Sequence, residues 1–404
     1  MRLAKRSMGR NQSALLALLL AATLAASCSV PRGWVPVSGS ISLPFRDDGT
    51  RDSLLTAISQ SRAYYRGLPA QYTISFGELA YTPQQMVRSL DLFESLVNTV
   101  DDPEAFRREF ERRFLVFESV AESGNNLFTG YYEPVIPGSE TPSGNLTTPL
   151  YNRPADLVEI PLELFGKDMP PRRLVGRVES GRVVPYYSRR EIDQKLPKAG
   201  AAKAIVYVNP VDLFFLQVQG SGRVEMPDGR TMRVGFDSTN GHPYRSLGAE
   251  MIRRDMLRQE DVTLHSIREY LAGNPSQVAA LLNRNPSYVF FRERQGDDQP
   301  VGNLGVPLTP GRSLAADQRV VPPGSLAYVA TTVPVVRDPA NTQPLQRFMM
   351  VQDVGGAIRG HGRGDIFWGA GPAAEWRAGY ARSPGRLFLI VARKEYVFDG
   401  GVAP

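Results

Sequence analysis

The chain has very few of the residues that build disulfides and metal centres. Its 404 residues include one cysteine and three histidines. A single cysteine cannot form an internal disulfide, so the core must hold the fold together even in an oxidising compartment. So few imidazoles and thiols leave no ligand set for a zinc site. We therefore expect neither a metal nor any other cofactor.

Long hydrophobic runs are missing beyond the first thirty residues. The apolar run over residues 14–26 follows four basic residues, Arg2, Lys5, Arg6 and Arg10. The run is too short to span a bilayer stably, and the pattern is typical of an export signal over residues 1–27. The sole cysteine, Cys28, comes directly after it, as in the lipobox of bacterial lipoproteins. Lipidation of Cys28 is therefore predicted, with ordinary cleavage at an Ala-x-Ala-like site as the alternative.

These features predict the compartment and the start of the mature chain. We expect a periplasmic protein that is anchored to the outer membrane as a lipoprotein. Residues 28–52, which are rich in Ser, Pro and Gly, are predicted to be a tether.

Basic clusters with interleaved aromatic residues are missing as well. The formal net charge is +6 at pH 7, and the export signal carries four positive charges and no negative one, so its removal leaves +2. Nucleic-acid binding thereby loses its main support, and we expect no nucleic-acid partner.

Chain length and composition favour two domains built mainly from short strands. Single cores stop growing near roughly 250 to 300 residues, which this chain exceeds. The sequence holds 37 glycines and 32 prolines, with β-branched runs between them. This pattern is typical of many short strands joined by turns.

Three helices are nevertheless predicted before residue 120. Ser53 caps the first, and Thr82-Pro83 opens the second. The third begins at residues 101–104 and carries an aromatic stripe that we interpret as core: Phe106, Phe110, Phe114 and Phe117. The predicted fold class is therefore mainly β with helices (α+β).

A glycine-dense stretch over residues 349–380 is the first candidate site. Asp353 and Asp365 border a loop that contains five glycines. One interpretation is a tight connection between strands, in which the aspartates bond their own backbone. The other is a sugar-binding site, because Phe367 and Trp368 follow Asp365 at once and flat rings beside a carboxyl suit saccharide stacking.

A second candidate lies at residues 212–224. Read as a strand, this run turns Phe214, Leu216 and Val218 to one face and its glutamines to the other. Side-chain amides followed by Gly-Ser-Gly suit hydrogen bonding to sugar hydroxyls or N-acetyl groups. A simple hairpin is an equally good interpretation.

Six stretches of the sequence resemble the lytic murein transglycosylase A family of Gram-negative bacteria. They occur in family order at residues 128–134, 217–222, 241–248, 285–291, 317–324 and 352–371. The C-terminal part resembles the three-aspartate (3D) barrel, with Asp317, Asp353 and Asp365 as the three aspartates.

The resemblance implies a double-psi β-barrel domain into which a second β-barrel domain is inserted, with a groove between them for a glycan strand. On this basis, residues 53–130 are expected to be the helical part of the first domain, 131–294 the inserted domain, and 295–398 the 3D barrel. Glycan strands of peptidoglycan are the expected partner of a monomeric protein.

The resemblance also implies the activity, that of a peptidoglycan lytic exotransglycosylase in cell-wall turnover. Such enzymes cleave the β-1,4 bond between N-acetylmuramic acid and N-acetylglucosamine and form 1,6-anhydromuropeptides. The catalytic acid falls on Asp365, and its pKa must be raised for this role. Asp353 and Asp317 are the expected supporting carboxylates. The expected substrate contacts are Thr129, Gly130, Tyr131, Gln217, Gln219, Gly220, Ser221, Gly222, Phe367 and Trp368.

Two rival functions were compared with this prediction. An aspartic protease needs a second Asp-[Ser/Thr]-Gly, which the sequence does not contain. A non-catalytic peptidoglycan- or carbohydrate-binding protein of barrel fold remains the alternative, and it predicts that Asp365 is dispensable.

Overall fold

The computed structural model describes residues 33–37, 45–121, 124, 126–166, 168–170, 172–295, 299–356 and 358–398. The predicted export signal and Cys28 lie outside these residues. Among the described helices, none has the length and apolar character needed to cross a membrane.

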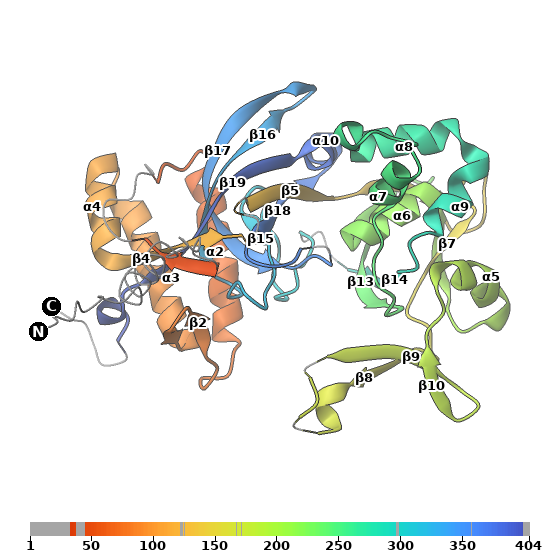
Figure 1. Cartoon of the computed structure of the whole chain (residues 1–404), viewed down its shortest axis with the longest axis horizontal. Helices are drawn as coiled ribbons and strands as arrows, with labels where there is room; N and C mark the ends of the chain where they lie inside the picture. The colour runs from red at the N-terminus through yellow and green to blue at the C-terminus, as the bar shows by residue number, and fades with distance from the viewer. Residues whose placement is uncertain are drawn as a thin grey trace, which may run out of the picture.

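The centre of the first domain is a closed six-stranded β-barrel (Figure 1). Its strands follow the order β19-β16-β17-β15-β18-β5, and β5 pairs back with β19 to close the ring. Closure leaves no free edge inside the ring, and the expected barrel fold is confirmed. The strand bounds are β5 Asn126–Glu133, β15 Ser313–Ala315, β16 Leu326–Val335, β17 Asp338–Asp353, β18 Arg363–Ala370 and β19 Arg382–Ala392.

Three N-terminal helices pack against this barrel and share its core. They are α2 (Arg51–Arg66), α3 (Pro83–Thr99) and α4 (Pro103–Arg113). The α3 start is as predicted, with a capping box between Thr82 and Gln85. Their apolar faces are buried with the barrel strands, as in the edge-to-face contact of Phe93 with Phe348 at 4.9 Å. The short hairpin of β2 (Ile74–Phe76) and β3 (Leu79–Tyr81) connects α2 to α3.

The predicted aromatic helix is only half right. Helix α4 ends at Arg113, and Phe114 and Phe117 belong to strand β4 (Phe114–Val120), which pairs with β19. Both rings are buried as expected, and Phe110 stacks on Phe114 at 5.2 Å. The helical periodicity was misleading because pairing with the barrel edge outweighs the local pattern.

Part of the predicted tether is also folded. Residues 33–36 form β1 (Gly33–Pro36), which pairs with β4, and Phe45 is buried in the core. Buried Arg312 ties the approach to α2 onto the barrel through a bidentate pair with Asp47, at 2.6 and 2.7 Å. Residues 33–36, Phe45 and Asp47 therefore belong to the folded barrel domain and not to a tether.

The second unit follows β5 in the chain and is built on another six-stranded sheet. Its order is β14-β13-β12-β6-β11-β7, and the two edge strands β14 and β7 lie close together, so the sheet curls towards a barrel. The bounds are β6 Val135–Ser139, β7 Thr148–Tyr151, β11 Ala204–Val208, β12 Ser221–Glu225, β13 Thr231–Thr239 and β14 Val289–Arg294.

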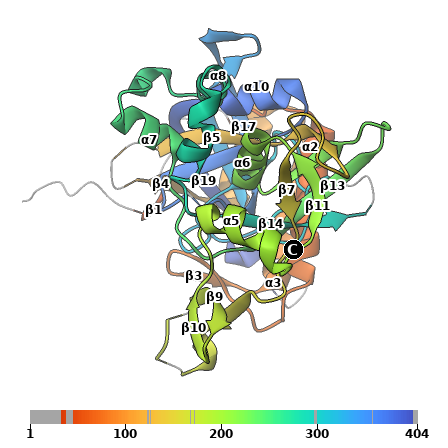
Figure 2. The same ribbon diagram turned by 90° about the vertical axis from the view of Figure 1, so that its right-hand side faces the viewer.

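Helices and a small outlying sheet complete this second unit (Figure 2). The helices are α5 (Arg189–Ala199), α6 (Pro210–Gln219), α7 (Leu247–Arg253), α8 (Leu264–Gly273) and α9 (Val278–Leu282). The strands β8 (Val158–Pro161), β9 (Arg173–Glu179) and β10 (Arg182–Pro185) form a three-stranded sheet that projects from the body in both views.

Residues 212–219 correct the sequence prediction of a strand. They form helix α6, which begins after the cap Asn209 with Pro210 in its first turn. The helix ends at Gly220, whose φ of 82° is the left-handed conformation of a C-cap. Its residues are apolar on almost every side, so alternation alone cannot tell a buried helix from a strand.

The two units meet along β5 and the helices beside it. Only Pro134 separates β5 in the barrel from β6 in the second sheet. Helix α10 (Pro372–Tyr380) of the barrel contacts α8, where the His265 ring stacks on Tyr380 at 4.7 Å. Near this junction, the Tyr132 hydroxyl donates to Glu375 at 3.0 Å. Strand β5 therefore carries its side chains from one unit to the other.

Candidate active site

Asp365 lies on β18, between strands β15 and β5. Its register partners are Ala315 on β15 and Thr129 on β5. The Thr129 hydroxyl donates a hydrogen bond to Oδ1 of Asp365, and the Arg363 guanidinium lies 3.5 Å from the same oxygen. The Asp365 side chain is 22% exposed, so it faces an opening while most of it is covered. No described residue donates to Oδ2, which leaves that oxygen available to a ligand.

The surroundings of Asp365 favour its protonated form. Burial raises the pKa of the Asp365 carboxyl above its ordinary value, because a desolvated carboxylate is costly. The hydrogen bond from Thr129 and the nearby Arg363 oppose this rise. Burial is the larger influence, so the pKa stays raised.

Asp353 ends β17 and is saturated with hydrogen bonds. Its Oδ1 accepts from the backbone N–H groups of Asn303 and Val354, each at 2.9 Å, and its Oδ2 accepts from the Tyr131 hydroxyl at 2.9 Å. Burial raises the pKa of this carboxyl too, and the three donors oppose the rise. Asp353 therefore serves as an acceptor that fixes its neighbours.

Tyr131 connects the two aspartates. Its hydroxyl binds Asp353, and its ring lies 5.2 Å from that of Phe367. Burial raises the pKa of Tyr131 well above its ordinary value, and the charges of Asp353 and Asp365 raise it further. The phenol thus stays neutral and acts as a donor.

Asp317 holds a loop and is not part of this cluster. Its side chain is 3% exposed and forms an ion pair with Arg319, with an oxygen–nitrogen distance of 2.5 Å. It also accepts from the backbone N–H of Gly360 at 2.8 Å. The Arg319 hydrogen bonds hold the pKa of Asp317 well below its usual range, so the carboxyl is ionised. It fixes the loop that joins β17 to β18.

The two aromatic residues after Asp365 face opposite ways. Phe367 shares the Asp365 face of β18, since alternate residues of a strand point to the same side. Trp368 points to the other side, where it is buried in the core beneath the Arg377 guanidinium at 5.3 Å. The predicted contact of Trp368 with substrate is therefore not supported. Phe367 lies on the Asp365 face but is buried, with its ring against Tyr131.

Gly130 contributes by having no side chain. A Cβ at this position would lie 2.5 Å from Nε1 of Trp368, so a glycine is required for the indole to pack across β5. Gly130 thereby supports the rear of the site.

The predicted substrate contacts of the two glutamines of α6 are not supported either. Gln217 is buried, and its side-chain N–H donates to the Val289 carbonyl at 3.1 Å. Gln219 accepts from the Tyr132 backbone N–H at 3.2 Å. Gly222 is covered by Leu216. Together with Gly220, which caps α6, these residues form the junction between α6 and β5. Of the five predicted contacts over residues 217 and 219–222, Ser221 is the one that lines a hollow.

Sequence reasoning missed two contributors to the cluster. Arg363 lies two residues before Asp365 on the same face, where strand alternation could have revealed it. Asn303 contributes its backbone N–H, for which residue identity gives no signal.

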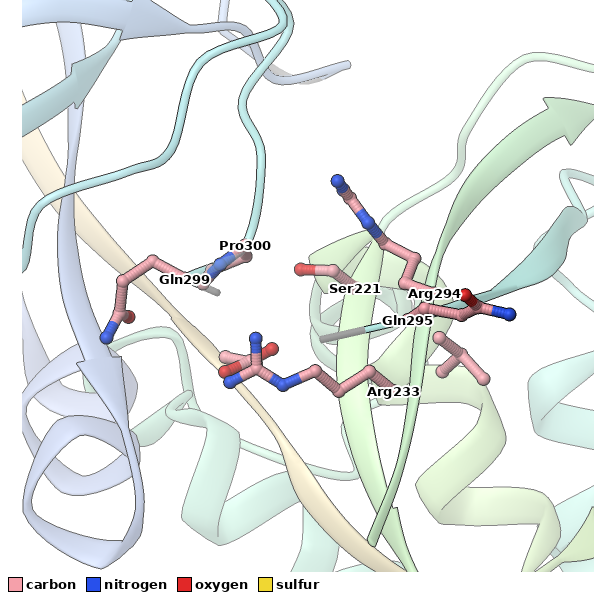
Figure 3. Close-up of a pocket in the computed structure, with 8 residues that line it drawn as sticks. Ser221, Arg233, Arg294, Gln295, Gln299 and Pro300 are labelled. Carbon is pink, nitrogen blue, oxygen red and sulfur yellow. The ribbon is translucent and has the colours of Figure 1, made fainter. Parts of the chain in front are cut away.

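A polar hollow lies where the second unit meets the connection back to the barrel (Figure 3). Its lining residues are Glu133, Ser221, Arg233, Val234, Arg294, Gln295, Gln299 and Pro300. Among the described residues no group of three His, Cys, Asp or Glu side chains could hold a metal ion.

A six-stranded barrel with a mostly covered aspartate on β18 and a second β unit beside it defines a two-unit, mainly β protein. Two family models match the chain, the MltA-specific insert domain over residues 127–292 and the 3D domain over residues 312–391. The chain is 34% identical to the membrane-bound lytic murein transglycosylase A of Escherichia coli K12 over 68% of this chain and 67% of that protein. It therefore belongs to the lytic murein transglycosylase A family.

Solved structures agree with this assignment. A membrane-bound lytic murein transglycosylase from Agrobacterium tumefaciens superposes with a TM-score of 0.73 at 29% identity, covering 91% of this chain and all of that one. Escherichia coli MltA with bound chitohexaose gives a TM-score of 0.67 at 26% identity, covering 89% and 95%.

Proposed function

We propose that this protein is a peptidoglycan lytic transglycosylase in which Asp365 carries out both proton transfers. The observation that carries the proposal is the setting of Asp365. The carboxyl is mostly buried, its pKa is raised, and one oxygen is held by Thr129 while the other is open. A carboxyl that enters the reaction protonated is what a leaving glycosidic oxygen needs.

The reaction proceeds in two proton transfers. Protonated Asp365 gives its proton to the oxygen between N-acetylmuramic acid and N-acetylglucosamine as the C–O bond breaks. The resulting Asp365 carboxylate then takes the proton from the 6-hydroxyl of the muramic acid residue while that oxygen bonds to the anomeric carbon. The products are a 1,6-anhydro end and a free N-acetylglucosamine end, and no water is consumed.

The occupancy of Asp353 supports a single-carboxyl mechanism. Hydrolytic glycosidases need a second carboxyl that is free to act as nucleophile or to activate water. Both oxygens of Asp353 are engaged by the donors at Tyr131, Asn303 and Val354. Asp353 therefore orients the site, and Asp317 supports it through the loop at Gly360.

The glycan strand is expected to lie along the face of β5 that presents Thr129 and Tyr131, between the barrel and the unit we assign to residues 131–294. The chitohexaose bound by the Escherichia coli relative supports a saccharide chain as ligand.

We also propose that Cys28 carries a lipid that holds the mature chain at the outer membrane. The relatives are named membrane-bound, which supports an anchor. Labelling cells with palmitate tests it: label on the wild type and none on Cys28→Ser is expected, and an unlabelled wild type would refute the anchor.

The experiment that tests the activity is product analysis in ¹⁸O-labelled water. Purified murein sacculi are incubated with the full-length protein in detergent, and soluble muropeptides are analysed by mass spectrometry. Unlabelled products one water lighter than hydrolysis fragments are expected. Products that carry ¹⁸O would identify a hydrolase, while binding to sacculi without any product would identify a carbohydrate-binding protein.

A further inference from the structure

An arginine row crosses three strands of the second unit beside the proposed glycan path. Arg233 on β13 is the register partner of Arg223 on β12 and of Arg294 on β14. Like charges placed directly opposite one another on neighbouring strands destabilise a sheet. Such a row calls for a negatively charged partner.

Among the described residues, one member of the row has such a partner. Arg223 binds Glu133 with a nitrogen–oxygen distance of 2.8 Å, and Glu133 is 3% exposed. Arg233 and Arg294 make no ion pair or side-chain hydrogen bond with any described residue. Asp297 and Asp298, further along the same connection, lie outside the described residues. Two guanidinium groups thus line the hollow beside one described carboxylate, Glu133, which is already paired with Arg223.

The backbone around these arginines is shaped to admit them. Arg294 lies over Gly235, where a Cβ would come within 2.6 Å of its Cδ atom. Figure 3 shows Ser221, Arg233 and Arg294 on one side of the hollow and Gln299 and Pro300 on the other. Hydroxyl, amide and guanidinium groups together suit a carboxylate ligand, which Arg binds through paired N–H donors.

The hollow is connected to the catalytic cluster from two directions. Glu133, in its wall, lies four residues after Thr129 on the same face of β5, or about 13 Å along the strand. The connection that supplies Gln299 and Pro300 also supplies the Asn303 N–H to Asp353. An extended peptide of four residues spans about the same 13 Å.

We infer that Arg233 and Arg294 bind a carboxylate on the peptide stem of the substrate, so that the enzyme prefers stem-bearing glycan to naked glycan. This inference rests on the proposed function. It makes the second unit a specificity element and not only a wall of the groove.

The test compares kcat/KM on glycan strands that carry their stems with kcat/KM on strands stripped of stems by an amidase. The wild type should prefer stem-bearing strands by about tenfold or more, since hydrogen bonds between charged groups are the strong ones. Arg233→Gln/Arg294→Gln should bring this ratio close to one. The matched control Arg182→Gln/Arg190→Gln, which removes two exposed arginines of the same unit, should keep the wild-type ratio.

Three further readouts keep the outcomes distinct. High salt should reduce the wild-type ratio, because screening weakens an exposed charge contact. The thermal midpoint of the double variant should not fall, because the substitutions remove like charges that face one another. If the midpoint does fall, the two single variants are compared instead, and each should lower the kcat/KM ratio in part. A wild-type ratio near one, or a double variant with the wild-type ratio, would overturn the inference. An absence of 1,6-anhydro products from both substrates would instead refute the proposed function, and the inference with it.

Discussion

Asp353 and Asp365 are both register partners of Ala315, one on each side of strand β15. Two strand spacings of about 4.8 Å therefore separate their backbones. The Tyr131 side chain reaches from β5 to Asp353, to which its hydroxyl donates a hydrogen bond. Both oxygens of Asp353 accept hydrogen bonds, whereas Oδ2 of Asp365 accepts none from a described residue.

Thr129→Val should change the pH profile of the reaction. The Thr129 hydroxyl donates to Asp365 and so stabilises its ionised form. Its removal should raise the pKa of Asp365, and the basic limb of kcat/KM against pH should move upward by up to about one pH unit, as a hydrogen bond is worth about 1 kcal/mol. Thr331→Val, which loses a similar bond to the Pro384 carbonyl at 2.8 Å, is the control. A basic limb that does not move, or moves down, would count against the role of Thr129.

Tyr131→Phe tests whether the Tyr131 hydroxyl contributes to catalysis as well as to folding stability. The change removes the donor to Asp353 and keeps the ring against Phe367. We expect a loss of about 1 kcal/mol in the free energy of unfolding, together with a lower kcat. Tyr328→Phe loses a comparable bond to the Arg46 carbonyl at 2.8 Å and should lower stability without lowering kcat. Equal kcat values for Tyr131→Phe and Tyr328→Phe would refute a role of the Tyr131 hydroxyl in the reaction.

Asp317→Asn should destabilise the protein in a pH-dependent way. The folded pKa of Asp317 is depressed, so its stabilising contribution is complete above the unfolded pKa near 4 and is lost as the pH falls towards the lower folded pKa. The wild type should exceed the variant by about 1 to 3 kcal/mol at pH 7, the cost of losing the bonds to Gly360 and Arg319. This difference should shrink below pH 4. Urea unfolding at pH 7 and pH 3 measures it, and a difference that grows at pH 3 would contradict the assignment.

Gly130→Ala should disturb the rear of the site. The new methyl would lie 2.5 Å from Nε1 of Trp368 and 3.1 Å from the Ala378 Cα. We expect a loss of about 1 to 3 kcal/mol, typical of overpacking, and reduced activity as β5 shifts. Gly273→Ala, at the end of α8 with open space around its Cβ, is the control and should be neutral in urea unfolding. Wild-type stability of Gly130→Ala would show that the packing is not tight.

The sequence predicted which residues gather at the candidate site better than it predicted the elements around them. Thr129 and Tyr131 come beside β18 and Asp365 because two strands distant in the chain, β5 and β18, pair in parallel. Asp353 on β17 joins them because β15 pairs with both β17 and β18. The motif resemblance pointed to these residues, but their spacing could not supply the pairing. Backbone donors such as that of Asn303 could not be predicted at all, because any residue provides one.

Two of the errors, at α6 and β4, share one physical cause. Helix α6 and strand β4 both consist of residues that are buried by their neighbours on several sides, so hydrophobic periodicity carries little information there. The signals that were present, Asn209-Pro210 and Gly220, mark the two ends of a helix. Trp368 was assigned to the site from its neighbourhood in sequence, while strand alternation turns it to the core.

The most direct test of the central claim compares kcat and ligand affinity for the wild type and Asp365→Asn, with Asp353→Asn beside them. Asp365→Asn should lower kcat on sacculi by about 10² to 10⁴-fold, as expected when a general acid is removed, while the Kd for chitohexaose stays within about threefold. Asp353→Asn should lose less in kcat, because it cannot be the proton donor in this account. A residual kcat within tenfold of the wild type for Asp365→Asn would contradict the assignment of Asp365 as the catalytic acid and base.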